Sequence, residues 1–247
     1  MKVTVLGMWG GFPQPGEATS GYLLETQNSK VLLDCGSGVV GQLLKYCDIN
    51  QLDAVVISHY HADHSCDVGV LQYARLVHQA MSGLSKCLPI YGFDHSDFGR
   101  LSYIREQQPI TEGVLYEANQ SFSIGDMTFI PFRTLHAVPC HGCRVISPEG
   151  TICYTADGGF TEQQIEAAAE VDLLISEANF SHEHVAMAEG NHMTGTQVGM
   201  LATQAKVKLV LLTHLPPLRP HEPIIREVKE VYSGPVRIAS MGAIIEV

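Results

Sequence analysis

Hydrophobic and polar residues alternate differently in successive parts of the chain. Alternating or β-branched runs predict a first strand at Lys2–Gly7 and a hairpin formed by residues 20–26 and 30–34. Apolar residues at helical spacing predict helices over residues 39–46 and 67–81. The first third of the chain is therefore expected to mix antiparallel strands with helices.

The rest of the chain changes from strands to helix–strand alternation. Strands are predicted at residues 88–91, 113–115, 121–124, 128–132, 143–147 and 151–155. Helices at 161–169, 194–205 and 222–232 then alternate with strands at 173–176 and 208–213, before two terminal strands. This order predicts mixed sheets packed between helices. Because no repeat, low-complexity tract or linker interrupts residues 1–247, we expect one domain.

Composition restricts the class of protein. Hydrophobic residues make up 45% and charged residues 17% of the 247 residues, as in ordinary globular proteins. A net charge of −11 disfavours a protein that binds nucleic acid over its whole surface. No apolar run approaches the roughly 18–20 residues of a membrane span. The seven cysteines are scattered along the chain, and the N-terminal residues do not resemble a signal peptide. Both observations predict reduced thiols and a cytoplasmic location.

The strongest chemical signal follows a predicted buried strand at residues 54–58. His59 and His61 are two positions apart, so in an extended chain both imidazoles point the same way. Asp63 and His64 then enter a turn and can point to a second position nearby. Imidazole and carboxylate together suit Zn²⁺ and similar ions. The alternative is a polar loop with chance histidines, which four ligand-type residues in six positions disfavour.

Three further ligand types follow predicted strands elsewhere. His136, Asp157 and His214 each come directly after such a run. Each alone would be a weak signal, since a lone histidine at a strand end is more often a capped surface residue than a ligand. Together with the histidine cluster, they predict one metal-binding rim at the ends of several strands.

These residues resemble the HxHxDH signature and later ligands of the metallo-β-lactamase superfamily. The resemblance covers nearly the whole chain and implies an α/β (α+β) fold, a four-layer αββα sandwich of two mixed β-sheets. It also implies two divalent ions, zinc or alternatively manganese, between the sheets. By position, the ligands would be His59, His61 and His136 for the first ion, Asp63, His64 and His214 for the second, and Asp157 bridging both.

Within that superfamily the chain is similar to the ribonuclease Z-like branch. Residues 32–36, 134–145, 173–180 and 190–194 resemble segments of that branch, and on this match His192 would be the proton donor. Only twenty residues, 137–156, lie between the third-motif histidine and the bridging aspartate. They leave no room for the long arm with which tRNA-processing members grip tRNA, so tRNA maturation is disfavoured. The resemblance also implies a homodimer.

This chemistry suits hydrolysis of a phosphodiester, such as an RNA end or a small cyclic phosphate. Two ions can share a water and lower its pKa, which supplies a bridging hydroxide at neutral pH. Asp63 can accept a hydrogen bond from that nucleophile and orient it. His192 can protonate the leaving group, because imidazole titrates near neutral pH.

Three other functions remain as alternatives. The same dizinc site could hydrolyse a lactone or thioester, where His192 would contribute little because the metals alone can stabilise the oxyanion. A di-iron redox site is disfavoured, since that branch resembles HxExD, with Glu in place of His61, and normally carries a flavin domain. A non-catalytic metal scaffold is disfavoured by the complete set of seven ligand-type residues.

Several residues keep two interpretations at this stage. Each is either part of the site or an ordinary loop or turn residue, and the choice depends on what it contacts in the fold. They are Asp34 (support for a ligand histidine, or a turn), Glu177 (orienting His192), His182 and His184 (substrate contact), and the CxxC pair Cys140 and Cys143 (redox or zinc chemistry).

Overall fold

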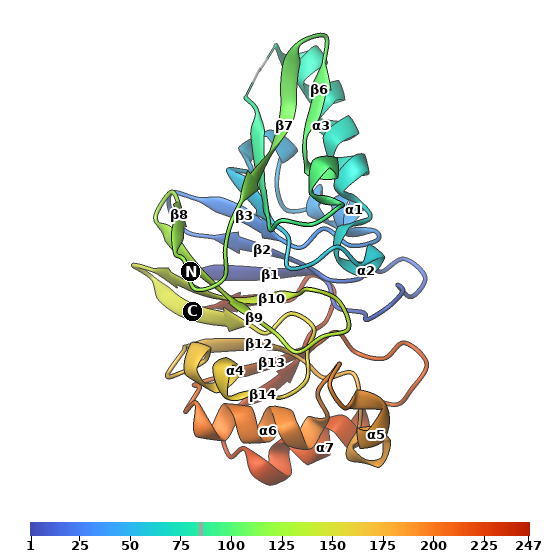
Figure 1. Ribbon diagram of the computed structural model, residues 1–247, viewed down its shortest axis with the longest axis vertical. Helices are drawn as coiled ribbons and strands as arrows, with labels where there is room; N and C mark the ends of the chain where they lie inside the picture. Colours follow the sequence, from blue (N-terminus) through green and yellow to red (C-terminus); the bar gives the residue numbers. More distant parts are fainter. Residues whose placement is uncertain (84–85) are drawn as a thin grey trace.

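Two β-sheets face each other between two layers of helices in the computed structural model, which describes residues 1–83 and 86–247 (Figure 1). Within the described residues, the first sheet has eight strands in the order β15-β1-β2-β3-β4-β5-β7-β6. Its strands are β1 Lys2–Gly7, β2 Gly21–Glu25, β3 Lys30–Leu33, β4 Ala54–Val56, β5 Leu88–Gly92, β6 Tyr103–Arg105, β7 Gln108–Leu115 and β15 Ile244–Glu246.

The second sheet has seven strands in the described part of the chain, in the order β14-β13-β12-β11-β10-β9-β8. Its β11, β12, β13 and β14 are parallel neighbours, whereas β8 to β11 form an antiparallel meander. The strands are β8 Phe122–Ile124, β9 Met127–Arg133, β10 His141–Ser147, β11 Gly150–Tyr154, β12 Leu173–Glu177, β13 Val210–Thr213 and β14 Val236–Ile238.

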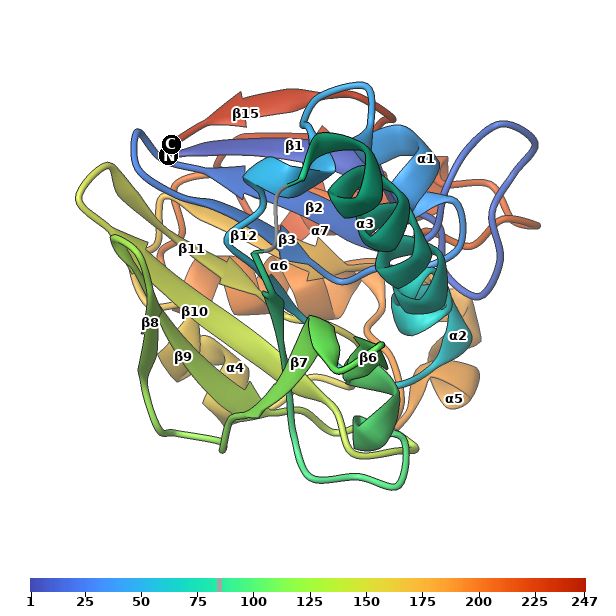
Figure 2. The same ribbon diagram turned by 90° about the horizontal axis from the view of Figure 1, so that it is seen from above.

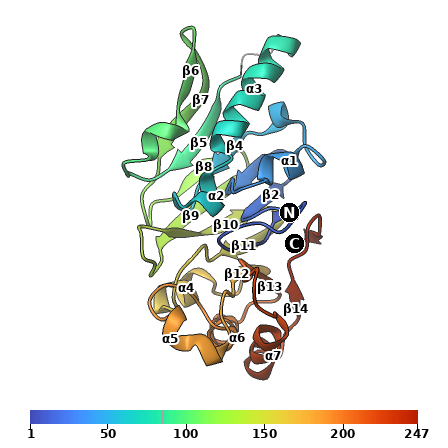
Figure 3. The ribbon, with the colours of Figure 1, turned by 90° about the vertical axis from the view of Figure 1, so that its right-hand side faces the viewer.

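Helices cover the outer face of each sheet, which confirms the predicted αββα class (Figures 2 and 3). The helices that follow strands of the first sheet are α1 Val39–Leu43, α2 Ala62–Ser65 and α3 Val68–Ser82, with the 3₁₀ turns η1 Ile49–Gln51 and η2 Phe98–Leu101. Those of the second sheet are α4 Glu162–Ala167, α5 Val185–Ala188, α6 Gly195–Gln204 and α7 Glu222–Val231, with η3 His182–His184. Among the described residues, no helix has both the length and the hydropathy to cross a membrane.

Alternating burial on the strands explains why the sheets stack. In β2, Tyr22 and Leu24 belong to the core between the sheets, whereas Leu23 packs into a separate core under α1 and α3. Both faces of the strand are therefore apolar and buried, as expected for a strand in the middle of a layered fold. The ends of these strands, rather than their faces, are left to carry polar side chains.

Most predicted elements are confirmed, with two informative differences. β7 begins at Gln108, five residues earlier than predicted, and pairs with β6, which was not predicted. Ile104 and Arg105 of β6 are exposed, so this edge strand has no alternation of buried and exposed residues to detect. β4 also ends at Val56 rather than Ser58, which places His59 and His61 in the connection to α2, while Asp63 and His64 lie in α2 itself.

Candidate metal centre and active site

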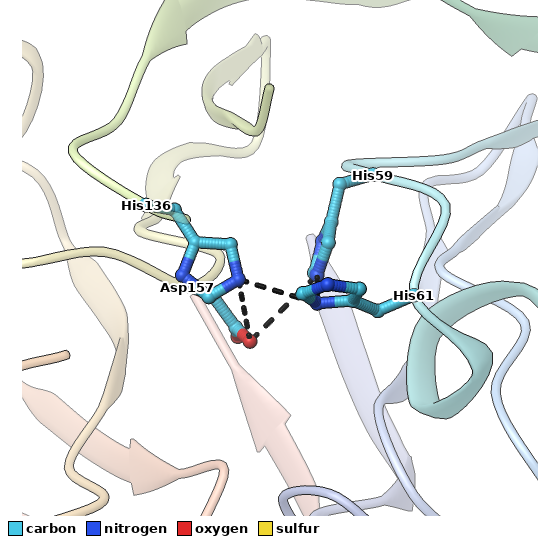
Figure 4. A group of neighbouring side chains, drawn as sticks. All are labelled: His59, His61, His136 and Asp157. Atoms are coloured by element: carbon cyan, nitrogen blue, oxygen red, sulfur yellow. Dashed lines mark hydrogen bonds and ion pairs between the residues drawn. The ribbon is translucent and has the colours of Figure 1, made fainter. Parts of the chain in front are cut away.

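Four side chains from distant parts of the sequence meet at the edge shared by the two sheets (Figure 4). One ligand atom from each of His59, His61, His136 and Asp157 lies within 4.8 Å of the others. His61 Nδ1 is 3.0 Å from His59 Nε2 and 3.2 Å from His136 Nε2. Asp157 Oδ2 lies 3.7 Å from His59 Nε2 and 3.8 Å from His136 Nε2, so this carboxylate completes the group.

A second group shares the same aspartate. Asp63, His64, Asp157 and His214 also bring their ligand atoms within 4.8 Å of one another. His214 Nε2 is 3.2 Å from both Asp63 Oδ2 and Asp157 Oδ2, and His64 Nε2 is 3.2 Å from Asp157 Oδ1. The structure thus brings together all seven residues expected to be ligands, in the two groups expected, with Asp157 common to both.

The donor set fits two cations. His61 Nδ1 faces the ring nitrogens of His59 and His136 at 3.0 to 3.2 Å. A metal ion bound among them would accept their lone pairs. Asp157 Oδ1 is buried and accepts no hydrogen bond of acceptable geometry from the described residues. A buried carboxylate oxygen is costly to leave unsatisfied, and a cation would remove that cost.

The connection from β4 to α2 is held from behind by Asp34. This buried carboxylate accepts hydrogen bonds from Ser58 N at 2.7 Å, Ser58 Oγ at 2.8 Å and Tyr154 Oη at 2.8 Å. It also lies 2.7 Å from His64 Nδ1, which leaves Nε2 of that ring directed at the centre. Of the two interpretations open for Asp34, its contacts favour support of a ligand-type histidine.

The ends of strands in the second sheet position the remaining ligand types. Asp157 follows β11 and His214 follows β13, and these strands are both parallel neighbours of β12. Ala156 and His214 have φ values of 50° and 49°, a left-handed conformation in which the chain turns sharply. Thr134 donates a hydrogen bond to Asp157 O at 2.6 Å and so ties the loop that carries His136 to this edge.

His192 lies beside both groups and is held by a buried carboxylate. Its Nδ1 is 3.0 Å from Glu177 Oε1 and 3.1 Å from Oε2, and Oε1 also accepts from Gly158 N at 2.6 Å. The His192 ring centroid is 5.3 Å from that of His136 and 5.5 Å from that of His214. The ring therefore stands at the rim of the metal centre with one nitrogen anchored.

Charge at the site is set by burial and by these partners. Burial lowers the pKa of His59 and of His61, which favours the neutral rings that bind metals. Burial raises the pKa of Asp63, but the hydrogen bond from His214 and the charges of His64 and His214 together outweigh it and hold the pKa of this carboxyl well below its usual range. Burial also lowers the pKa of His192, but the charge and hydrogen bond of Glu177, together with the charges of Asp157 and Asp63, outweigh it and raise the pKa to about 9. This direction favours the protonated ring.

A cavity of about 390 Å³ opens over the centre. Gly11 N donates to Asp63 Oδ2 at 2.7 Å, so the loop after β1 forms one wall. A Cβ on Gly10 would lie 2.8 Å from the His214 ring, which explains why a residue without a side chain stands there. Other lining residues are Phe12, Asn179, Phe180, Asn191, Pro216, Pro217, Leu218 and Arg219.

Two of these lining residues were not singled out from the sequence. Asn191 accepts at its backbone oxygen from His136 Nδ1 at 3.0 Å, and Arg219 follows His214 in the same loop. Neither stands at a recognisable ligand spacing. The signals available were that Asn191 lies in the 190–194 segment that resembles the ribonuclease Z-like branch and that Arg219 lies soon after His214.

In the described part of the chain, none of the histidines and cysteines left open belongs to either ligand group. His184 lines a neighbouring cavity, and His182 lines neither that cavity nor the one over the metal centre. Cys140 and Cys143 are buried free thiols whose pKa values are raised by that burial. Raised thiol pKa values disfavour the thiolate, which is the form that reacts or binds zinc.

Known proteins share both this sequence and this architecture. Residues 29–215 match the beta-lactamase superfamily domain. The chain is 40% identical over 248 residues to the probable metallo-hydrolase YhfI of Bacillus subtilis (strain 168), with 100% of both chains covered. The crystal structure of the metallo-β-lactamase fold protein YhfI superposes with a TM-score of 0.93 at 38% identity, covering 100% of this chain and 99% of that chain.

More distant structures share the fold. The short form of human tRNase Z superposes with a TM-score of 0.78 at 22% identity, covering 100% of this chain and 99% of the other. A diphosphatase from the PhnP family superposes with a TM-score of 0.77 at 21% identity, covering 100% and 97%. The superfamily match over most of the chain and the close relative from Bacillus subtilis agree with the sandwich and its paired ligand groups: the chain belongs to the metallo-β-lactamase superfamily.

Proposed function

We propose that this protein is a dinuclear metal-dependent phosphodiesterase. The observation that carries the proposal is the pair of ligand groups sharing Asp157, with the His192–Glu177 pair at their rim. Ligand types come from both sheets, so we also propose that residues 1–247 act as one hydrolase domain. The relative from Bacillus subtilis is named a probable metallo-hydrolase, tRNase Z is named for tRNA, and the diphosphatase for a diphosphate.

The ligand assignment follows the two groups. Nitrogen and carboxylate donors of this kind suit zinc, with manganese as the alternative. When bound, two such ions would lower the pKa of a water and stabilise charge on the phosphate oxygens. The proposed ligands are His59, His61 and His136 for one ion, Asp63, His64 and His214 for the other, and Asp157 for both.

Asp63 and His192 are the residues proposed to handle protons. Asp63 keeps its carboxylate ionised and oriented by Gly11 N, so it can accept a hydrogen bond from the attacking water. His192 anchors Nδ1 on Glu177, which leaves Nε2 to donate a proton to the leaving oxygen. Residues 137–156 consist mainly of the β10–β11 hairpin, so this segment is too short to contain a long tRNA-binding arm. This supports small phosphodiesters or RNA ends as substrates rather than whole tRNA.

The test compares two substrates at one site. Zinc- and manganese-loaded protein is given bis(4-nitrophenyl) phosphate and, separately, a chromogenic lactone, with the Asp157→Ala variant as background. Metal-dependent turnover of the phosphodiester, and little of the lactone, is the expected result. The reverse preference would make the protein an acyl hydrolase and leave His192 without its proposed task.

A further inference from the structure

Arg219 is the one lysine or arginine that lines the cavity over the metal centre within the described residues. It lies in the loop after β13, half-buried, with Cζ 4.8 Å from the centroid of the Phe180 ring. Its Nη2 is 3.9 Å from Met187 Sδ. A guanidinium stacked on an aromatic face is held in one orientation while its N–H groups remain free to bind.

No carboxylate in the described part of the chain forms an ion pair with Arg219. Among the described arginines, Arg100 and Arg105 pair with a carboxylate, so what distinguishes Arg219 is its place in the lining of the cavity. Arginine stays protonated at all physiological pH values, and its planar fork matches phosphate and carboxylate geometry. A guanidinium without a carboxylate partner, in the lining of the cavity over the metal centre, is available to an anionic ligand.

Phe180 fixes where that fork lies relative to the chemistry. This ring is 9% exposed, and its centroid is 5.8 Å from that of His192. Phe180 N donates to Met193 O at 3.3 Å and Phe180 O accepts from Gly195 N at 3.1 Å, directly after His192 in the chain. The Phe180 ring therefore neighbours both the guanidinium and the proposed proton donor.

Space for a ligand continues past Arg219. A second cavity of about 260 Å³ shares Asn179, Pro216 and Arg219 with the first and extends toward η3. Arg219 thus lines both cavities, beside the Phe180 ring that neighbours His192. Because His192 is the proposed proton donor to the leaving oxygen, a group bound at Arg219 is expected to belong to the leaving half of a substrate.

We propose that Arg219 binds a second phosphate group carried by the leaving half of the substrate. The inference rests on the proposed phosphodiesterase function and narrows its substrate class to phosphodiesters with an additional terminal phosphate. Arg219 acts as a specificity residue, because it orients the substrate without touching the reacting bond.

The test measures cleavage of three dinucleotides, UpU, pUpU and UpUp, by metal-loaded protein. One phosphorylated dinucleotide should exceed UpU in kcat/KM by about 10- to 100-fold, the range expected for a charge-assisted contact. In Arg219→Ala this ratio should fall close to one. Arg237→Ala, which removes an exposed arginine on β14 with the same change of net charge, should keep the ratio of the unaltered protein.

Failure of this inference can be told apart from failure of the proposed function. If bis(4-nitrophenyl) phosphate is hydrolysed but the dinucleotide ratio is equal in the unaltered protein and Arg219→Ala, the role of Arg219 is wrong and the phosphodiesterase stands. If no phosphodiester is hydrolysed, calorimetric titration with uridine 3′,5′-bisphosphate and uridine 5′-monophosphate decides. Tighter binding of the bisphosphate, lost in Arg219→Ala, supports the phosphate site, and equal binding of both compounds overturns it.

Discussion

Asp157 is the residue on which both ligand groups depend. Its Oδ1 faces His64, whereas Oδ2 faces His59, His136 and His214. Burial raises the pKa of this carboxyl, but the neighbouring histidines outweigh that effect and keep it well below its usual range. One ionised side chain therefore supplies negative charge to two positions at once.

Replacing Asp157 with alanine should remove both ions together. We expect the Asp157→Ala variant to lose bound zinc, measured by plasma mass spectrometry, and to lose hydrolysis of bis(4-nitrophenyl) phosphate. Asp94→Ala, which removes an exposed carboxylate outside both ligand groups, is the matched control and should keep both. Retention of two ions by Asp157→Ala would contradict the bridging assignment.

His192→Ala should separate metal binding from catalysis. This variant is expected to keep both ions but to cleave phosphodiesters about 10²- to 10⁴-fold more slowly, the usual contribution of a general acid. Metal content and kcat are measured on the same samples. Equal loss of metal in His192→Ala and Asp157→Ala would show that His192 is a ligand rather than a proton donor.

Glu177→Gln should act through His192. The amide keeps the size of the side chain but removes the charge that raises the pKa of His192 to about 9. The protonated ring is the active form, so the rate is expected to fall as pH rises through that pKa. In Glu177→Gln this alkaline limb should move to lower pH, with metal content unchanged, and an unmoved limb would rule out the positioning role.

At the scale of elements, the turn after β3 supports the helix that carries Asp63 and His64. Cys35 N donates to His64 O at 2.8 Å, and Ser20 N donates to Asp63 O at 3.1 Å. A Cβ on Gly36 would lie 1.9 Å from Asp63 O, a backbone atom that cannot move without α2. The turn and α2 are therefore packed as one unit.

Gly36→Ala should disturb this unit, whereas Gly41→Ala should not. Overpacking at Gly36 is expected to lower the free energy of unfolding by about 1–3 kcal/mol and to reduce bound metal. Gly41 lies in α1 with open space around it, so the same substitution there should stabilise the protein by roughly 0.5–1 kcal/mol. Thermal unfolding and metal content measure both effects, and normal metal content in Gly36→Ala would contradict the argument.

At the scale of the whole molecule, the metal centre joins the two halves of the sandwich. His59, His61, Asp63 and His64 lie in the connection that leaves the first sheet, whereas the remaining ligand types lie at strand ends of the second. Ions bound between these segments would connect the two halves, and this connection exists only in the folded state. Stability should consequently depend on metal concentration.

Adding zinc to metal-free protein should raise its melting temperature. The increase should continue with zinc concentration, because a ligand that binds the folded state stabilises it by RT ln(1 + [L]/Kd), about 2.7 kcal/mol at one hundred times Kd. Scanning calorimetry measures the shift, and Asp157→Ala serves as the control that should show little of it. An equal shift in both proteins would place the zinc effect elsewhere.

Local sequence predicted mixed sheets between helices and singled out the seven ligand-type residues, whereas the four-layer sandwich was implied by the resemblance to the superfamily. Strand periodicity and short turns depend on neighbouring residues, and four of the seven lie within six positions of one another. Edge strand β6 was not predicted because Ile104 and Arg105 are exposed, so its sequence lacks the alternation of apolar and polar residues. The boundary of β4 was placed late because Ile57 and Ser58 are as buried as the strand before them.

The contacts around the centre were decided by tertiary structure. Asp34 meets Tyr154 across 120 positions of sequence, and His214 meets Asp63 across 151. Such pairs depend on how the two sheets stack and where their strands end, which no local pattern records. Arg219 is the clearest case, since its orientation comes from the face of Phe180 and its cavity from loops far apart in the chain. The residue types in the sequence indicate the chemistry of the site, but only the stacking of the sheets brings these residues within reach of one another.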